Sequence, residues 1–231
     1  MKIERYLLVL MFALPFVCAS SPQPVFCSDI TGDAIIEKPL APDPGVLLQR
    51  LEKKLSDFTN LKTDFVEEKY LAIFKKKIVL QGRIYLQKPD KIAWHVDRPV
   101  RYSVLITDKV IRQWDEDTDK VQELALSDNP VFKTVLSQMT AWFSGSYGVL
   151  QGDYNITVER QRPAVIEFTP KEHNFAKKVI KSVTVTFRED ERYLKQIVIM
   201  ETSGDSTTIT FENTVINTPI DNRFFTITRH G

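Results

Sequence analysis

The feature that most constrains the fold of this 231-residue chain is an alternation of apolar and polar residues with a period of two. From residue 78 to residue 86, every second residue is an isoleucine, a leucine or a glycine. Such alternation is typical of antiparallel strands that bury one face and expose the other. The pattern predicts further short strands over residues 61–65, 92–96, 102–106, 110–114, 121–126, 154–160, 164–169, 179–187, 194–200 and 207–213.

One helix is predicted ahead of the first strand. Pro44 suits an initial helical turn. Leu47, Leu51, Leu55 and Phe58 follow at spacings that place them on one face of a helix.

A second helix is predicted midway along the chain. Asn129 can cap its start. Val131, Val135, Met139 and Trp142 then form a second apolar stripe at helical spacing.

These elements together define a fold class. Because the pattern contains no strand–helix–strand repeat, the chain is predicted to be mainly β with some α structure. A sheet of about eleven strands tends to curl, and two apolar helix stripes need an apolar partner. We therefore predict an incomplete antiparallel β-barrel whose helices cover the concave apolar face and leave a lipid-sized cavity.

The first residues are typical of an export signal. Lys2 and Arg5 form a short basic region, and residues 6–17 form an apolar run that is too short to span a bilayer. Small residues then precede position 20. We predict a cleaved signal peptide over residues 1–19, which implies export.

Cys18 raises an alternative, a lipid anchor attached to that cysteine. Lipoprotein cleavage sites prefer a small residue before the cysteine, and Val17 occupies that position. If residues 1–19 are removed, Cys27 is the remaining cysteine, so an internal disulfide is not expected.

The rest of the chain divides into a leader and one domain. Residues 20–43 are irregular and rich in proline, which predicts a flexible leader. Residues 44–231 are predicted to form a single domain, since 43% of the chain is apolar and can supply a core.

Charge and motifs exclude several function classes. The formal charge of +1 provides no basic field for nucleic acid. His95, His173 and His230 lack metal-ligand spacing, and no nucleotide-binding loop or paired-cysteine zinc motif is present. The acidic residues at 115–117 and 189–191 are interpreted as solvated turns. We therefore predict no enzyme, no cofactor and no metal site.

The stretch from residue 80 to 99 reads LQGRIYLQKPDKIAWHVDRP. A glycine opens a strand at Gly82, Lys88 precedes a proline, and a strand containing Trp94 ends at Pro99. This spacing resembles the signature of the LolA-type outer-membrane lipoprotein carriers. The similarity continues over residues 61–65, 107–109, 168–170, 207–213 and 224–225.

The resemblance implies a function. Members of the family hold acyl chains between the sheet and the helices, and transfer lipoproteins from an inner-membrane transporter to an outer-membrane acceptor. On this basis we expect a monomeric periplasmic carrier of an acylated lipoprotein or another lipid, with an inner-membrane donor complex and an outer-membrane acceptor as partners. The expected cavity lining is Leu51, Leu55, Phe65, Ile84, Leu86, Ile92, Trp94, Val135, Met139 and Trp142.

One position departs from the family. Its members carry an arginine before the proline, which ties the lid to the sheet through hydrogen bonds to helix carbonyls. Here that residue is Lys88, whose ammonium lacks the planar fork of a guanidinium. It shares the inward side of its strand with Ile84 and Leu86, so a lid contact is expected. The alternative is a strand-end lysine that reaches solvent. We also expect the two helices to close on each other when no ligand is bound.

Two further functions remain open at this point. The chain could carry a different lipid, such as a glycolipid or a pigment lipid, because the fold serves several ligands. It could also be a sensor or structural module without cargo.

The expected hairpin end at residues 71–77 reads LAIFKKK. Its apolar residues beside three lysines could touch an anionic membrane surface. An ordinary hairpin end is the alternative.

Overall fold

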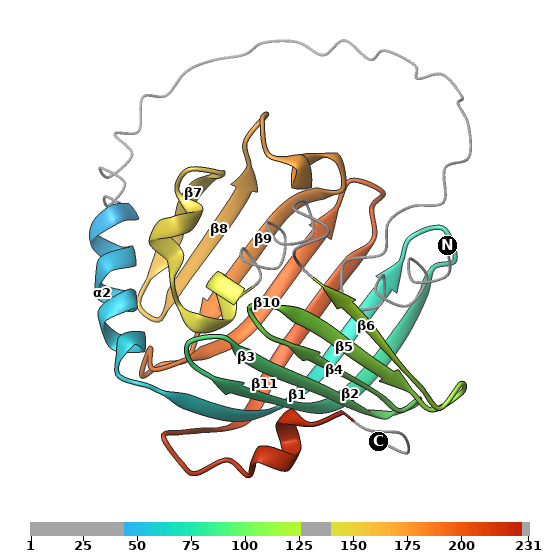
Figure 1. The fold of residues 1–231 in the computed structure, drawn as a ribbon. Helices are drawn as coiled ribbons and strands as arrows, with labels where there is room; N and C mark the ends of the chain where they lie inside the picture. Colours follow the sequence, from blue (N-terminus) through green and yellow to red (C-terminus); the bar gives the residue numbers. More distant parts are fainter. Residues whose placement is uncertain (1–43, 126–139, 228–231) are drawn as a thin grey trace, which may run out of the picture.

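The computed structural model describes residues 44–125 and 140–227 (Figure 1). The predicted signal peptide, the proline-rich leader, and the cavity residues Val135 and Met139 lie outside the described residues. Among the helices that are described, none is both long enough and apolar enough to cross a membrane.

The domain is built on one antiparallel sheet of eleven strands, which confirms the predicted fold class. The strand order is β6-β5-β4-β3-β2-β1-β11-β10-β9-β8-β7, so β1 pairs with β11 and joins two meanders. β6 and β7 form the two edges, and the barrel is incomplete (Figure 1). In chain order the strands are β1 (Asn60–Leu71), β2 (Lys76–Gln87), β3 (Lys91–Arg98), β4 (Tyr102–Ile106), β5 (Val110–Asp115), β6 (Lys120–Ala125), β7 (Tyr154–Gln161), β8 (Ala164–Pro170), β9 (Ile180–Phe187), β10 (Leu194–Glu201) and β11 (Ser206–Ile216).

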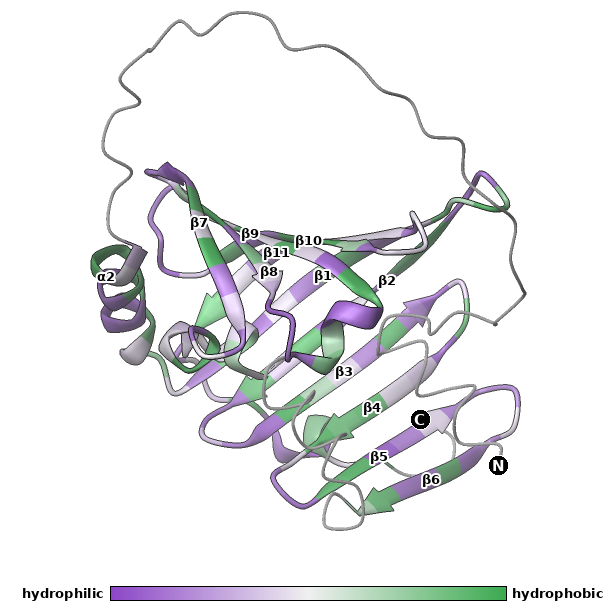
Figure 2. Cartoon of the chain, turned by 90° about the horizontal axis from the view of Figure 1, so that it is seen from above, coloured by the Kyte–Doolittle hydropathy of each residue, from purple (hydrophilic) through white to green (hydrophobic). Residues whose placement is uncertain are grey.

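The sheet is curved, and its concave face carries the main core. Seen from above, apolar and polar residues alternate along the strands (Figure 2). The register aligns the apolar positions of neighbouring strands: Ile84 of β2 lies opposite Trp94 of β3, which lies opposite Val104 of β4. All three side chains are buried. The period-two pattern in the sequence therefore corresponds directly to one buried face.

Gly82 allows β2 and β3 to approach each other closely. A Cβ atom at this position would lie 1.9 Å from the carbonyl oxygen of His95 and 2.9 Å from the ring of Phe65. The ladder between β2 and β3 has a register irregularity at Gln81 and Gly82. Only glycine fits this site, which gives the sequence motif a structural cause.

The first predicted helix is confirmed as α2 (Pro44–Ser56). Its buried side chains are Leu47, Leu48, Leu51 and Leu55. Two basic residues in the last turn interact favourably with the helix dipole. The helix lies beside the edge strand β7 (Figure 1) and packs against the 3₁₀ helix η2 (Tyr147–Leu150).

The second predicted helix is described only in its last turn, residues 140–144. Gly145 follows with φ of +82°, a conformation that glycine adopts without strain. The ring of Phe143 lies edge-on to Trp94 of β3, at 5.7 Å between centroids, and to Phe211 of β11, at 5.9 Å. This segment therefore lies over the centre of the concave face.

The convex face corrects one expectation, because it is not solvated throughout. Tyr85, Ala93, Leu105, Trp114 and Ile227 form a second, smaller core there. The chain after β11, including η4 (Asn222–Phe225), covers it, and the ring of Phe224 stacks on that of Tyr85 at 4.3 Å. β4 is accordingly buried on both faces along its whole length.

Candidate functional site

The predicted cavity residues come together in one continuous apolar core on the concave face. Eight of the ten are described, and each is at most 4% exposed: Leu51, Leu55, Phe65, Ile84, Leu86, Ile92, Trp94 and Trp142. They come from α2, from the strands β1 to β3 and from residues 140–144. The two helical segments and the sheet thus share a single apolar surface.

Three hydrogen-bond donors in this core have no acceptor among the described residues. They are the indole N–H groups of Trp94 and Trp142 and the hydroxyl of Tyr193, and all three side chains are at most 4% exposed. A buried donor without a partner is rare and costs about 1–3 kcal/mol. An apolar site with unpaired donors is suited to a ligand that carries both hydrocarbon and a hydrogen-bond acceptor.

Lys88 lies where the lid contact was expected. Its Nζ donates a hydrogen bond of 2.8 Å to the carbonyl oxygen of Leu55, near the C-terminal end of α2. The same ammonium lies 3.9 Å from the ring centroid of Phe58, a cation–π distance. Burial lowers the pKa of Lys88, and nearby Asp57 offsets part of this effect. The contact connects the turn between β2 and β3 with α2.

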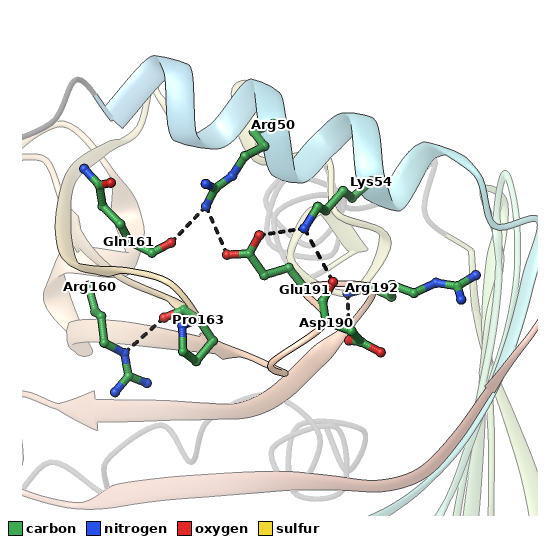
Figure 3. Close-up of polar contacts among 8 residues, drawn as sticks. All are labelled: Arg50, Lys54, Arg160, Gln161, Pro163, Asp190, Glu191 and Arg192. Carbon is green, nitrogen blue, oxygen red and sulfur yellow. Dashed lines mark hydrogen bonds and ion pairs between the residues drawn. The ribbon is translucent and has the colours of Figure 1, made fainter.

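A second polar contact, which was not among the predicted ones, holds α2 (Figure 3). Glu191, in the turn between β9 and β10, accepts hydrogen bonds from Arg50 at 3.0 Å and from Lys54 at 2.8 Å. Its side chain is 4% exposed. The interpretation of residues 189–191 as a solvated turn is therefore wrong for Glu191, because the carboxylate points under α2 rather than into water.

The turn that follows the second helical segment also contacts α2 directly. Glu52 of α2 accepts a hydrogen bond from the backbone N–H of Gly148. A Cβ atom on Gly145 would lie 2.5 Å from a methyl carbon of Leu55, so the backbone of this turn is packed against the helix. The contacts of Lys88, Glu191 and Glu52 attach α2 to the segments around it through polar groups; we call them the rim contacts of α2.

A carboxyl group of β1 lies inside the apolar face. Glu67 of β1 continues the inward series of Leu61, Thr63 and Phe65, and it is 7% exposed. Burial raises its pKa to about 7, although Lys69 opposes the shift. Burial raises the pKa of Tyr102 across the face, and the negative charge of Glu67 adds to that shift. The alternation predicted over residues 61–65 places Glu67 inward when it is continued by two residues, so this group could have been predicted.

Other chemistry is sparse in the described part of the chain. It contains no group of three or more His, Cys, Asp or Glu side chains that could hold a metal ion. His95 lies on the convex face, where its ring nitrogens are 2.8 Å from Ser103 Oγ and 2.9 Å from the carbonyl oxygen of Phe224. Burial lowers its pKa. His95 therefore helps to attach the C-terminal segment.

The sequence and the fold both have known relatives. A sequence model of the family described as "Outer membrane lipoprotein carrier protein LolA" matches residues 56–228. The outer-membrane lipoprotein carrier protein of Chromohalobacter salexigens is 25% identical over 179 residues, which cover 77% of this chain and 80% of that protein. Among solved structures, an uncharacterized conserved protein from Thermus thermophilus superposes with a TM-score of 0.50 at 11% identity, covering 80% of this chain and 94% of that one. A LolA superfamily protein from Nitrosomonas europaea superposes with a TM-score of 0.43 at 9% identity, covering 79% and 97%.

Proposed function

Because the chain belongs to the LolA family of outer membrane lipoprotein carrier proteins, we propose that it binds the acyl chains of lipoproteins between its sheet and its helices. In this proposal it works in the periplasm, receives cargo from an inner-membrane donor complex and delivers it to an outer-membrane acceptor. It acts by binding and release, without catalysis.

The observation that carries the proposal is the single apolar core shared by the sheet and two helical segments. α2 and residues 140–144 contribute Leu51, Leu55 and Trp142 to it, opposite the apolar face of the strands. Separation of these helices from the sheet would expose a continuous apolar surface. An acyl chain could replace the contacts that the helices lose.

The unpaired donors support an acylated ligand in particular. Transfer of hydrocarbon out of water contributes about 0.8 kcal/mol for each methylene group, whatever the rest of the ligand is. The indole N–H groups of Trp94 and Trp142 add a polar preference, since an ester or amide carbonyl could accept from them. Ester and amide groups both occur where an acyl chain joins a lipoprotein.

Reversible binding follows if the helices close over the apolar surface when no ligand is bound. A sixteen-carbon chain gains on the order of 12 kcal/mol in an apolar site before ordering costs, so release is the harder step. The rim contacts of α2 stabilise the closed, empty form, and a ligand has to compete with it. The difference in free energy between the closed, empty form and the open, ligand-binding form then sets the affinity for the acyl chain.

A charge on the concave face tests the proposal. Leu86→Glu should abolish the binding of a fluorescent fatty-acid probe, because a carboxylate would enter the apolar site. Leu105→Glu is the matched control: Leu105 is also a buried strand leucine, but it belongs to the convex core. Circular dichroism and thermal melting establish that both variants fold. Equal binding by the two folded variants would exclude the concave face as the site.

The identity of the cargo needs a separate measurement. Protein purified from its native host should release lipoprotein acyl chains or a bound lipoprotein, detectable by mass spectrometry of an organic extract. A glycolipid or a pigment lipid in the extract would support the proposed binding site but identify a different cargo. An empty extract, together with no binding of the probe, would contradict the carrier function itself.

A further inference from the structure

Seven consecutive residues at the β1–β2 hairpin are exposed, and their sequence is Ile-Phe-Lys-Lys-Lys-Ile-Val (residues 73–79). Ile73 is 86% exposed and Phe74 67%, while Ile78 and Val79 are each more than 40% exposed. Single exposed apolar residues are common on protein surfaces. Two exposed apolar pairs on either side of three consecutive lysines are unusual and indicate an interaction surface.

The hairpin end is a defined structure. The backbone N–H of Ala72 donates a 2.8 Å hydrogen bond to Asp205, in the turn between β10 and β11. The turn itself closes with a bond from the N–H of Lys75 to the carbonyl oxygen of Ala72, with Lys75 in the left-handed region at φ of 48°. The side chains of Ile73 and Phe74 are therefore presented from a fixed turn.

Two other turns at the same end of the sheet also place an exposed apolar residue beside a cation. The antiparallel order places the β1–β2 turn, the β3–β4 turn and the β8–β9 connection at one end of the strands (Figure 1). In the β3–β4 turn, Val100 is 48% exposed beside Arg101. In the β8–β9 connection, the 3₁₀ helix η3 (Phe175–Lys178) contains Phe175, which is 53% exposed, and the ammonium of Lys178 lies 5.3 Å from its ring centroid.

Acidic neighbours pair with some of the cations in these turns and, within the described part of the chain, leave others unpaired. Glu68 pairs with Lys77 at 3.2 Å, Glu116 with Arg101 at 3.6 Å, and Glu172 with Lys177. Lys75 and Lys76 have no ion pair among the contacts of the described residues, although Asp205 lies at the base of the hairpin. The tip is therefore apolar and locally positive.

We propose that the tip of the β1–β2 hairpin docks on an anionic lipid bilayer, with Ile73 and Phe74 entering the interface and Lys75, Lys76 and Lys77 contacting acidic headgroups. Apolar side chains beside cations are the pattern that binds such surfaces. A second copy of the chain is a poorer partner, because two tips would bring like charges together. The docking surface deepens the proposed carriage of acyl chains, since a carrier must meet membranes, but it can be tested without any cargo.

The test is flotation of the purified protein with vesicles, comparing phosphatidylglycerol-containing vesicles with neutral phosphatidylcholine vesicles. Wild-type protein should float with the anionic vesicles, less at high salt, and not with the neutral ones. Ile73→Glu with Phe74→Glu should lower binding at least tenfold. Replacing the three lysines by glutamine should lower it about fivefold for each lysine.

Matched controls separate the hairpin from general effects. Val215→Glu replaces an exposed apolar residue on β11, and glutamine at Lys53, Lys91 and Lys109 removes the same charge at other exposed positions. Both controls should bind vesicles like wild type, and all variants should keep the fatty-acid probe affinity. Docking is refuted if wild type fails to bind anionic vesicles, or if the lysine control loses as much binding as the hairpin variant. It is equally refuted if the hairpin substitutions only convert a dimer to a monomer in sedimentation.

Discussion

Removing the charge of Glu191 should lower the stability of the protein and raise its affinity for a ligand. Glu191→Gln keeps the shape of the side chain and removes its ion pairs with Arg50 and Lys54. Each charge-assisted hydrogen bond contributes about 1.5–3 kcal/mol. The cations are 28% and 42% exposed, so solvent screening reduces this contribution. We expect the free energy of unfolding to fall by about 2 kcal/mol.

The effect on ligand affinity follows from where that energy acts. In the proposed mechanism the ion pairs stabilise only the closed form, in which α2 lies against the sheet. Destabilising that form by about 2 kcal/mol would raise the affinity for an acyl chain by at most about thirtyfold. The rate of ligand release should fall correspondingly.

Urea denaturation measures the stability, and titration with a fluorescent fatty acid, followed by stopped-flow displacement, measures affinity and release. Glu189→Gln is the control, because Glu189 lies in the same turn but is exposed. It should change neither quantity. If Glu191→Gln loses stability while its affinity stays equal to that of wild type or falls, α2 does not move when ligand binds, and the closure mechanism is wrong.

Three further predictions concern single groups at the rim or in the core. Lys88→Arg should be tolerated because a guanidinium can still donate to the carbonyl of Leu55, whereas Lys88→Leu should change the release rate measured by stopped flow. Trp142→Phe should weaken binding of an acyl ester about tenfold in a calorimetric titration, but not binding of an alkane probe of equal length, because only the ester can accept from the indole. Glu67→Gln should reduce the loss of stability between about pH 4.5 and pH 7 in urea melts. With its pKa raised to about 7, folded Glu67 favours the protonated form, so ionisation costs up to about 3 kcal/mol as the pH rises through this window.

The strands and α2 could be predicted because their burial follows a simple period in the sequence. Every second residue of β2 from Leu80 to Leu86 is inward, and the stripe of Leu47, Leu51 and Leu55 is buried as its spacing indicates. The convex core was missed because it breaks this rule. The consecutive apolar residues at 104–106 were the available signal, since a strand buried on both faces loses its alternation.

The rim contacts of α2 were harder to predict, and the reason is physical. Arg50 and Lys54 are four residues apart and lie on one helical face, which indicates a shared partner. Nothing local to residues 189–191 shows which of three acidic residues is that partner. The choice of Glu191 depends on how a turn far along the chain meets α2, and such tertiary contacts have no period in the sequence.

In the proposed mechanism, the distribution of polar and apolar contacts around α2 suits reversible binding. The apolar contacts lie at the centre, where an acyl chain could substitute for Leu51 or Leu55 against the sheet. The ionic and hydrogen-bonded contacts lie at the rim, where water can replace them once α2 moves. When α2 moves, an acyl chain would therefore replace the lost apolar contacts, and water would replace the lost ionic and hydrogen-bonded contacts. On this proposal a few rim groups set the free-energy difference between the closed and open forms, so substitutions there would change cargo affinity without altering the apolar surface that the cargo contacts.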